Sequence, residues 1–354
     1  MNFDYIVYIG RFEPVHAGHV ATLKKAAELG THVIVLIGSA KQPRTIKNPW
    51  TESEREAMLS RAIQESGLNT TQFSFAPIVD RPYNDQQWVT EVQSAIYGVI
   101  HARSTKTDEG LDRKKSTIAI IGYDKDESSW YLNLFPQWKR IPMENVDGLH
   151  STRIRSMLFS NGSMAELKDN LPQTVYNWLD QWMTQHPEEL SQLMKEFKFI
   201  QRYKDAWKAA PYPPTFVTVD AVVIQSGHVL LVKRKTEPGK GLWALPGGFV
   251  DQNERLDDAV LRELKEETRL KVAAPILKGS IKATHVFDYP TRSLRGRTIT
   301  KAYLIELTPG ELPEIRGASD AEKAQWVPLS EFMNMQEMLF EDHHAIVSYF
   351  LGRV

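Results

Sequence analysis

The sequence predicts an α/β protein of two domains, the first built on a parallel sheet and the second of the α+β class. The length of 354 residues suits roughly two domains. The first half alternates short apolar runs with amphipathic stretches, which is typical of a parallel sheet covered by helices on both faces. A proline-rich stretch, AAPYPPT at 209–215, separates this half from a region rich in Val, Ile and Leu.

The elements of the first domain follow from these runs. Buried strands are expected over four of them, Tyr5–Ile9, His32–Ile37, Phe73–Ile78 and Thr117–Ile121. Helices are expected over the amphipathic stretches Gly18–Leu29, Glu52–Glu65 and Asp85–Ile100. The polar stretch 101–116 is predicted to be a surface loop. We therefore expect a first domain over 1–170, followed by a helical connector over 171–210.

The elements of the second domain, 211–354, begin with a hairpin. Thr215–Gln225 and Val229–Lys233 have strand composition and flank Ser226-Gly227, a turn signal. One strong helix is expected at Leu256–Arg269. Strands near Gly279–Phe287 and Thr298–Glu306, and a helical end from Leu329 to Leu351, complete a mixed α+β domain.

Composition excludes several classes of function. The absence of cysteine excludes disulfides, thiolate zinc sites and a cysteine nucleophile. With 43 Lys and Arg against 44 Asp and Glu, no global charge attracts nucleic acid or a membrane surface. No segment has the pattern of a signal peptide or a membrane span, so we expect a cytoplasmic protein. Self-association into a homo-oligomer is left open.

The residues after the first strand form a candidate phosphate site. Gly10 ends that strand, and the segment GRFEPVHAGH leads into the first helix. Parallel sheets bind ligands at the carboxyl ends of their strands, and a helix N-terminus offers N–H groups to phosphate. His16 and His19 lie three residues apart and can both reach one phosphate. The alternative is that both histidines are merely structural. We favour the phosphate site, because the two histidines occur together with Gly10 and a preceding strand.

A second cluster supports this site. Ser151 or Thr152 can cap the helical turn that follows, and Arg153 and Arg155 add charge for phosphate contacts. Alone, this segment could equally be an ordinary helix cap with surface arginines.

Together the two clusters resemble the HxGH and ISSTxxR motifs of the nucleotidylyltransferase superfamily, whose fold is Rossmann-like. The segment 16–19, HAGH, matches the first motif in full. The second motif has Leu149 and His150 where Ile and Ser are usual, but it keeps Ser151, Thr152 and Arg155.

Three further segments resemble the archaeal-type nicotinamide-mononucleotide (NMN) adenylyltransferases: Gly38–Lys41, Asn48–Arg55 and Arg81–Val89. In that family a Trp stacks on the nicotinamide ring and an Asn hydrogen-bonds its carboxamide. The resemblance therefore implies that Trp88 and Asn84 bind NMN. Packing in the core is the alternative for Trp88, because tryptophan is usually buried.

The resemblance implies transfer of an adenylyl group from ATP to NMN, giving NAD and pyrophosphate. NMN brings its own phosphate nucleophile, so the protein has to position the reactants and stabilise charge. A magnesium ion would be carried mainly by ATP. The resemblance assigns ATP binding to Gly10, Arg11, His16, His19, Ser151, Thr152 and Arg155, with His16, His19 and Arg155 catalytic.

The second candidate site is a helix with three glutamates. Glu263, Glu266 and Glu267 are spaced i, i+3 and i+4, so we expect their carboxylates to converge on one helix face. Such a face is favourable when hard divalent cations such as Mg²⁺ or Mn²⁺ bind to it. A solvated charged helix is the alternative. Glu254 and a Pro-Gly-Gly at 246–248 stand in register with the helix and argue against that alternative.

The segment from Gly248 to Leu270 resembles the Nudix box, GX5EX7REUXEEXGU, at every fixed position but one. Arg269 stands where the second Gly is expected, at a helix end where Gly normally adopts a left-handed conformation. The resemblance implies that Glu263, Glu266 and Glu267 bind metal and that Glu266 and Glu267 serve catalysis. Metal-activated water then attacks a pyrophosphate.

Segments around the box, Trp243–Gly248, His285–Arg297 and Ser319–Trp326, resemble the ADP-ribose pyrophosphatase branch. That resemblance implies diphosphate contacts for Arg292 and Arg297, with ordinary surface arginines as the alternative. It also implies a catalytic carboxylate from a late loop, for which Glu322 is the candidate.

The combination resembles a bifunctional bacterial architecture of NAD metabolism. Its substrates would be ATP, NMN and ADP-ribose, the last cleaved to AMP and ribose 5-phosphate. One alternative keeps both folds with other acceptors or dinucleotides. Another is a sensor that binds ADP-ribose without hydrolysis, but sensors should carry a DNA-binding module and a degraded set of glutamates, and all of the box glutamates are present here.

Overall fold

The computed structural model describes residues 3–104, 116–123, 127–143, 150–161 and 163–352. The chain divides into two compact units, Met1–Met194 and Lys195–Val354, and each is described by itself. This division lies within the stretch predicted as a connector, ahead of the proline-rich segment. In the described part of the chain, no helix is both long enough and apolar enough to cross a membrane.

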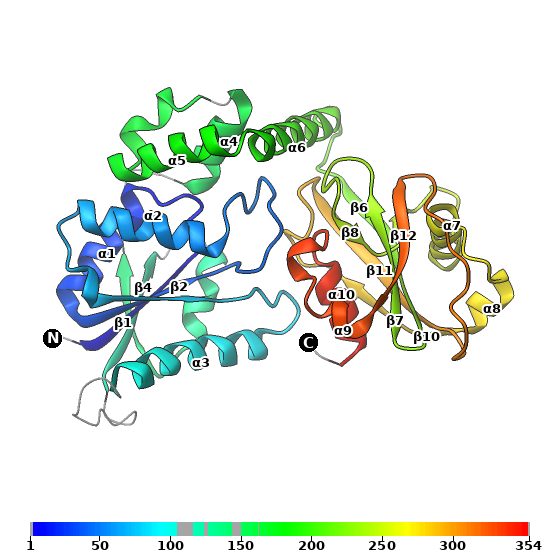
Figure 1. Cartoon of the computed structure of the whole chain (residues 1–354), viewed down its shortest axis with the longest axis horizontal. Coiled ribbons are helices and arrows are strands. Elements are labelled where there is room, and N and C mark those ends of the chain that lie inside the picture. Colours follow the sequence, from blue (N-terminus) through cyan, green and yellow to red (C-terminus); the bar gives the residue numbers. More distant parts are fainter. Residues whose placement is uncertain (1–2, 105–115, 124–126, 144–149, 162, 353–354) are drawn as a thin grey trace. The chain divides into compact units, whose positions relative to one another are not determined.

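The N-terminal unit is a parallel five-stranded sheet flanked by helices (Figure 1). The strand order is β3-β2-β1-β4-β5, as expected for a Rossmann-like domain, with one more strand than predicted. The strands are β1 (Phe3–Gly10), β2 (Gly30–Ile37), β3 (Phe73–Pro77), β4 (Ile118–Tyr123) and β5 (Lys139–Met143). The helices are α1 (Ala17–Leu29), α2 (Glu52–Glu65), α3 (Asp85–Ser104), α4 (Ser151–Asn161) and α5 (Gln173–Gln185), with 3₁₀ turns at Thr70–Gln72, Glu127–Leu134 and Ala165–Asn170.

The alternation of apolar residues along β1 explains why helices cover both faces of this sheet. Tyr5, Val7 and Ile9 point to one face, where they pack in one core with Val92 and Ile96 of α3. Helices α1 and α2 lie on the opposite face (Figure 1). The carboxyl ends of the strands are thereby left for the loops that carry the first candidate site.

Helix α3 is longer than predicted. It continues through Ser104, so the first residues of the predicted loop 101–116 are helical. Buried Ile100 anchors this last turn, and the basic side chains of His101 and Arg103 suit a helix C-terminus. The rest of that loop lies almost entirely outside the described residues.

The predicted connector contributes a helix to the N-terminal unit. Glu65, at the end of α2, accepts the backbone N–H groups of Gln173 and Thr174 and so caps α5. Trp182 of α5 is buried, and its indole donates to Glu54 of α2 at 2.8 Å. Helix α6 (Pro187–Ala206) then runs across the boundary between the two units.

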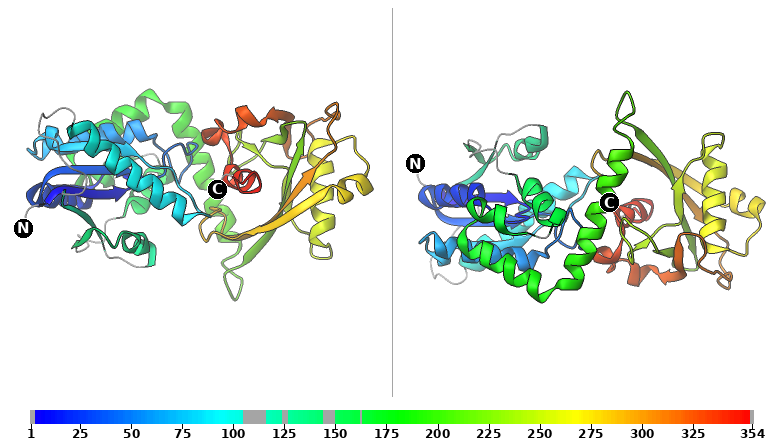
Figure 2. Two further views of the ribbon diagram at one scale, coloured as in Figure 1. Left: turned by 90° about the horizontal axis from the view of Figure 1, so that it is seen from below. Right: turned by 90° about the horizontal axis from the view of Figure 1, so that it is seen from above.

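The C-terminal unit is a mixed seven-stranded sheet with helix α7 packed against it (Figures 1 and 2). The main strand order is β10-β11-β6-β7-β12, in which β11 and β6 are parallel and the other neighbours antiparallel. The strands are β6 (Thr215–Gln225), β7 (His228–Arg234), β8 (Trp243–Ala244), β9 (Gly247–Phe249), β10 (Ile281–Phe287), β11 (Arg297–Glu306) and β12 (Ala321–Pro328). The helices are α7 (Leu256–Thr268), α8 (Ala274–Gly279), α9 (Leu329–Phe332) and α10 (His343–Phe350), with a 3₁₀ turn at Gln336–Met338.

The predicted hairpin of β6 and β7 is present, and Ser226 and Gly227 both have positive φ, at 46° and 74°. Val260 and Leu264 of α7 are fully buried against the sheet, as the periodicity indicates. Two expectations are wrong. The segment 321–328 is strand β12 rather than part of a loop, and the C-terminal end is two helices separated by an irregular stretch.

Candidate functional sites

The two histidines of the first site form a reciprocal cap at the start of α1. The Nδ1 atom of His16 accepts the N–H of Gly18, and the Nδ1 atom of His19 accepts the N–H of His16, both at 3.2 Å. The two rings lie 3.8 Å apart. Because each Nδ1 accepts a hydrogen bond, a neutral ring carries its proton on Nε2. The fold therefore fixes the tautomer in which both Nε2 atoms are donors.

Gly10 is needed to make room for a neighbouring side chain rather than for close approach of a ligand to the backbone. A side-chain Cβ at this position would lie 2.7 Å from the ring of Phe12. Phe12 has a φ of 57° and its ring also contacts His19 edge-on, with 5.0 Å between ring centroids. The glycine thus leaves room for the ring of Phe12, which packs against His19.

Arg11 and Arg155 meet at one loop, residues 46–48. Arg11 donates to the backbone oxygen of Lys47 and to Oδ1 of Asn48, each at 2.5 Å. The guanidinium of Arg155 donates to the backbone oxygens of Ile46 and Glu13, at 3.0 and 2.6 Å. Burial lowers the pKa of Arg155 to about 10, which still leaves it cationic at neutral pH. The two predicted phosphate ligands are brought together and positioned by backbone carbonyls.

The hydroxyl groups of Ser151 and Thr152 were predicted to cap a helix, but they bind other groups. Helix α4 begins at Ser151, whose hydroxyl donates to the backbone oxygen of Pro14 at 3.2 Å. The hydroxyl of Thr152 accepts from Arg155 at 3.2 Å. Arg153 is exposed. The cluster therefore joins α4 to the loop between β1 and α1.

A buried ion pair beside this site was not predicted from the sequence. Glu13 and Arg55 are each about 1% exposed, and their charged atoms lie 3.5 Å apart. Arg55 also donates to the backbone oxygens of Arg11, Gly38 and Ser39, at 2.6–3.1 Å. Burial raises the pKa of Glu13 to about 7, against the opposing effect of the nearby arginines. The only sequence signal was an acidic residue, Glu13, in the short loop that follows the first strand.

Asn84 and Trp88 lie at the start of α3. Oδ1 of Asn84 accepts the N–H of Gln87 at 2.9 Å and so caps the helix, which leaves the NH₂ group as its remaining donor. Trp88 is half-buried and contacts Tyr131 and Phe135, with ring centroids 5.9 Å apart in both cases. The indole thus packs on one side while part of it stays accessible.

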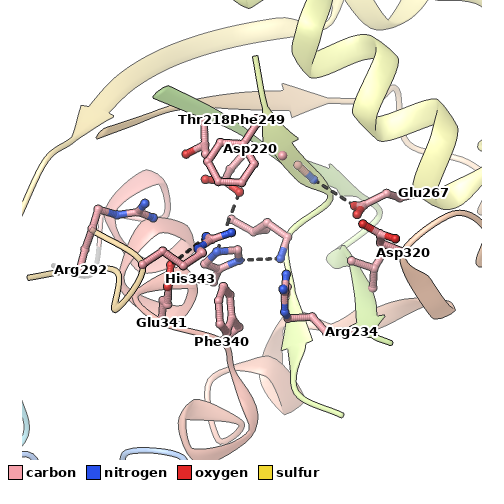
Figure 3. Close-up of a pocket in the computed structure, with 16 residues that line it drawn as sticks. Thr218, Asp220, Arg234, Phe249, Glu267, Arg292, Asp320, Phe340, Glu341 and His343 are labelled. Atoms are coloured by element: carbon pink, nitrogen blue, oxygen red, sulfur yellow. Dashed lines mark hydrogen bonds and ion pairs between the residues drawn. The ribbon is translucent and has the colours of Figure 1, made fainter. Parts of the chain in front are cut away.

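The second site contains a pocket between the Nudix-like segment and the C-terminal residues (Figure 3). Its walls come from β6 to β9, from the end of α7, from the segments before β11 and β12 and from the residues at the start of α10. The charged and aromatic residues that line it are Asp220, Arg234, Phe249, Glu267, Arg292, Arg295, Asp320, Phe340, Glu341 and His343.

The three glutamates of α7 have two different partners. Arg262 binds Glu263 at 2.8 Å and Glu266 at 3.3 Å, and it also pairs with Glu254 at 2.8 Å. Glu267 instead accepts the N–H of Gly247 at 3.1 Å. Within the described residues, no three acidic or histidine side chains are placed to share a metal ion. The carboxylates of Glu263 and Glu266 therefore converge on the same nitrogen, Nη1 of Arg262, whereas the carboxylate of Glu267 is bound to the backbone of Gly247.

The donor set nevertheless fits a divalent cation. All three groups are hard oxygen donors on one helix face. Burial raises the pKa of Glu267 to about 8 and also raises that of Glu263, so their negative charge is costly without a cation nearby. Gly248 leaves room for the carboxylate of Glu263, since a Cβ there would lie 2.7 Å from Oε1.

Arg269 adopts the conformation that the Nudix box normally gives to glycine. It caps α7 with φ 47° and ψ 32°, and its N–H donates to the backbone oxygen of Lys265 at 2.9 Å. The helix therefore ends in the same left-handed geometry, at some cost in strain.

Of the other residues predicted for this site, Arg292 lines the pocket and Arg297 and Glu322 do not. Arg292 lines the pocket but is buried in a bidentate pair with Asp342, at 2.7 and 2.9 Å. Arg297 is partly exposed beside Asp288 and is not among the pocket residues. Glu322 is exposed on β12, whereas Asp320, two residues earlier, lines the pocket.

Several pocket residues have no sequence signal strong enough to find them. His343 is buried, and its Nδ1 accepts the N–H of Leu245 at 2.8 Å. Phe340 and Glu341 lie in the irregular stretch that was predicted as helix. Arg234 directly follows the predicted strand Val229–Lys233 and is the last residue of the observed strand β7, and the sequence around it indicates no role.

Comparisons with known proteins match both units. The model of the cytidylyltransferase-like family matches residues 7–157, and that of the NUDIX domain matches residues 214–350. A crystal structure of a bifunctional NMN adenylyltransferase/ADP-ribose pyrophosphatase from Francisella tularensis is 35% identical, with a TM-score of 0.90 over 99% of both chains. The chain belongs to the family of bifunctional NMN adenylyltransferases/ADP-ribose pyrophosphatases.

Single-activity relatives match each half of this bifunctional chain. A nicotinamide/nicotinic acid mononucleotide adenylyltransferase of Acinetobacter baylyi is 33% identical over 51% of the chain and 93% of that protein. An ADP-ribose pyrophosphatase of Methanocaldococcus jannaschii is 34% identical over 44% of the chain and 83% of that protein. A second structure of the Francisella protein, with AMP and a manganese ion, is 34% identical with a TM-score of 0.88 over 99% of both chains.

Proposed function

We propose that the N-terminal unit makes NAD from NMN and ATP and that the C-terminal unit hydrolyses ADP-ribose to AMP and ribose 5-phosphate. The observation that carries this proposal is the similarity to the bifunctional Francisella protein over 99% of the chain. It is supported by a histidine-capped helix in one unit and a carboxylate-bearing helix beside a pocket in the other.

In the N-terminal unit, His16 and His19 bind the phosphates of ATP. Their backbone-bound Nδ1 atoms direct both Nε2 donors away from the helix, and each donor is fixed before substrate arrives. Arg11 and Arg155 add positive charge at the loop 46–48 and contact the β- and γ-phosphates, while Ser151 and Thr152 support that contact. The phosphate of NMN attacks the α-phosphorus, and pyrophosphate leaves.

NMN is oriented by the start of α3. The NH₂ group of Asn84 donates to the carbonyl of the nicotinamide, since its oxygen already caps the helix. The ring of nicotinamide stacks on the accessible face of Trp88, whose other contacts are aromatic side chains of the core.

In the C-terminal unit, Glu263, Glu266 and Glu267 would hold a divalent cation, which supplies a nucleophilic water and neutralises charge on the pyrophosphate. For the cation to bind, Arg262 must release Glu263 and Glu266. Arg262 then stays bound to Glu254, to which it donates two hydrogen bonds at 2.9 and 2.8 Å. Arg292 shapes the substrate pocket through its pair with Asp342, and Arg297, which pairs with Asp288 outside the pocket lining, is the second candidate for a diphosphate contact. Glu322 is kept as a candidate for the catalytic carboxylate.

The proposal is tested by a substrate panel on the purified chain, with products separated by chromatography. We expect NAD and pyrophosphate from NMN plus ATP, and metal-dependent AMP from ADP-ribose. Other mononucleotides and dinucleotides in the panel test the alternative substrates. Binding of ADP-ribose with no AMP at any metal concentration would favour a sensor and contradict the hydrolase assignment.

A further inference from the structure

Arg55 of α2 is buried beside the first candidate site and has no assigned role there. Its side chain is 1% exposed, so ATP and NMN cannot touch it. Nη1 of Arg55 donates to the backbone oxygens of Arg11 and Gly38, at 2.8 and 2.6 Å, and Nη2 donates to that of Ser39 at 3.1 Å. Arg11 follows β1 and Gly38 follows β2, which is its parallel neighbour in the sheet. One buried side chain thus joins the loops at the carboxyl ends of both strands.

The two loops that Arg55 joins contain strained backbone. Phe12 and Ser39 have φ angles of 57° and 51°, in the left-handed region that disfavours residues other than glycine. Phe12 directly follows Arg11, and Ser39 is itself bound to Arg55 through its backbone oxygen. Strained conformations of this kind persist only where surrounding contacts hold them. Because Arg55 supplies such contacts at both loops, the shape of the loops depends on this side chain.

The loop after β1 is connected to both arginines that are proposed to bind the β- and γ-phosphates of ATP. Arg11 belongs to this loop, and its own backbone oxygen is the one that Arg55 binds. Arg155 donates to the backbone oxygen of Glu13 at 2.6 Å, and the carboxylate of Glu13 lies 3.5 Å from Arg55. A displacement of the loop would therefore move Arg11 and Arg155 together.

The contacts of Arg55 require the shape of a guanidinium. This group carries five N–H donors in a rigid planar fork, whereas the ammonium of lysine carries three at a single point. Nε of Arg55 donates to the backbone oxygen of Thr51 at 3.2 Å, so all three of its nitrogens bind backbone oxygens. A lysine at this position can keep the charge beside Glu13 but cannot span the carbonyl groups of two strands. Substitution can therefore separate the charge of Arg55 from its hold on the loops.

We infer that Arg55 is a positioning residue for adenylyl transfer, which places Arg11 and Arg155 at the β- and γ-phosphates of ATP by holding the loops after β1 and β2 together. Arg55 acts through these loops and does not touch the substrate. This inference rests on the proposed function, because Arg11 and Arg155 are taken to bind those phosphates.

The experiment compares Arg55→Lys and Arg55→Met in the full chain with the same two substitutions at Arg61, an exposed arginine of the same helix. Initial rates of NAD formation give kcat and the KM values for ATP and NMN. Two inhibition constants of the same reaction are measured, one for pyrophosphate, which stands for the β- and γ-phosphates, and one for AMP, which has neither. Hydrogen exchange of the amides in 11–13 and 38–41 reports on the loops, and thermal melts report on the fold.

Arg55→Lys should fold, because the charge beside Glu13 is kept. Its KM for ATP and its inhibition constant for pyrophosphate should rise by about tenfold or more, as expected when charge-assisted contacts are misplaced. KM for NMN and the inhibition constant for AMP should change by less than about twofold, since Asn84 and Trp88 lie on α3, across the sheet from α2. Both loops should exchange faster, and the Arg61 variants should match the unchanged chain. Arg55→Met should show larger changes in the same two constants, and Arg55→Lys keeps the test decisive if Arg55→Met does not fold.

An unchanged KM for ATP and unchanged inhibition by pyrophosphate in folded Arg55→Lys would overturn the inference. Equal rises in the constants for pyrophosphate and AMP would also overturn it, as would a lower melting temperature with every constant unchanged, because Arg55 would then serve only the stability of the unit. The proposed function fails separately. If the unchanged chain makes no NAD from NMN and ATP, adenylyl transfer is refuted, and the exchange of 11–13 and 38–41 in Arg55→Lys still decides whether Arg55 holds these loops.

Discussion

Replacing Glu13 by Gln should stabilise the N-terminal unit at pH 8 and have almost no effect at pH 5. Glu13 is buried beside Arg55, and burial raises its pKa from 4.5 to about 7. A carboxyl whose pKa is higher in the folded state favours folding while it is protonated. That advantage is complete below pH 4.5 and is lost as the pH rises through 7.

The size of the effect follows from the same two values. One pKa unit corresponds to about 1.4 kcal/mol, so the difference between 4.5 and about 7 corresponds to about 3 kcal/mol at pH 8. Gln resembles the protonated carboxyl in size and charge and does not carry this penalty. Arg55 tolerates the change because backbone oxygens of Arg11, Gly38 and Ser39 already accept its N–H groups.

The assay is hydrogen exchange of the β1 and β2 amides at pH 5 and pH 8, which reports on the N-terminal unit alone. The matched control is Glu28→Gln on α1, whose side chain is 65% exposed and pairs with Lys25. The variant should gain stability relative to the wild type only at the higher pH, and the control should show no such difference. If Glu13→Gln is less stable than the wild type at pH 8, the ion pair with Arg55 is net stabilising and the reasoning is wrong.

Four further outcomes are expected. His19→Ala should reduce NAD formation by on the order of 100-fold and leave AMP release from ADP-ribose intact; equal loss of both activities would contradict separate sites. Asn84→Asp keeps a side-chain oxygen for the N–H of Gln87 and loses the donor, so KM for NMN should rise while KM for ATP and the melting temperature stay constant. Glu267→Gln should reduce ADP-ribose hydrolysis by orders of magnitude across a magnesium titration, with NAD formation as the internal control. Arg269→Gly should stabilise the C-terminal unit by about 0.5–1 kcal/mol in denaturant melts, because a left-handed φ of 47° strains arginine.

The sequence predicted most of the elements whose residues alternate or repeat clearly. Glu52–Glu65 is a helix with the predicted bounds because Thr51 and Glu54 form a capping box that can be read locally. Strand β5 was missed, since Lys139–Met143 is a short edge strand with a proline and little apolar character. Its place in the sheet depends on pairing with β4, which no local pattern indicates.

The candidate sites were predictable where spacing along one helix decides the geometry, as for His16 and His19. The side-chain partners were not. Arg262 lies next to the glutamates in sequence, yet only its rotamer determines that it holds Glu263 and Glu266. The pocket residues near 340 approach Arg234 through the fold, about a hundred positions away in sequence, and no periodicity reveals such a contact.

The bond between Trp182 and Glu54 changes how the stretch between the two activities should be regarded. Glu54 also binds Arg44 through both carboxylate oxygens, at 3.0 and 3.1 Å, and Arg44 belongs to the loop that carries Lys47 and Asn48. Truncation of the chain just before α5 would remove the indole of Trp182, which binds Glu54. The loop would then be held less firmly, and the hydrogen bonds from Arg11 to Lys47 and Asn48 would weaken. A fragment designed to make NAD on its own should therefore extend through α5, because that helix stabilises the substrate-binding loop of the N-terminal unit.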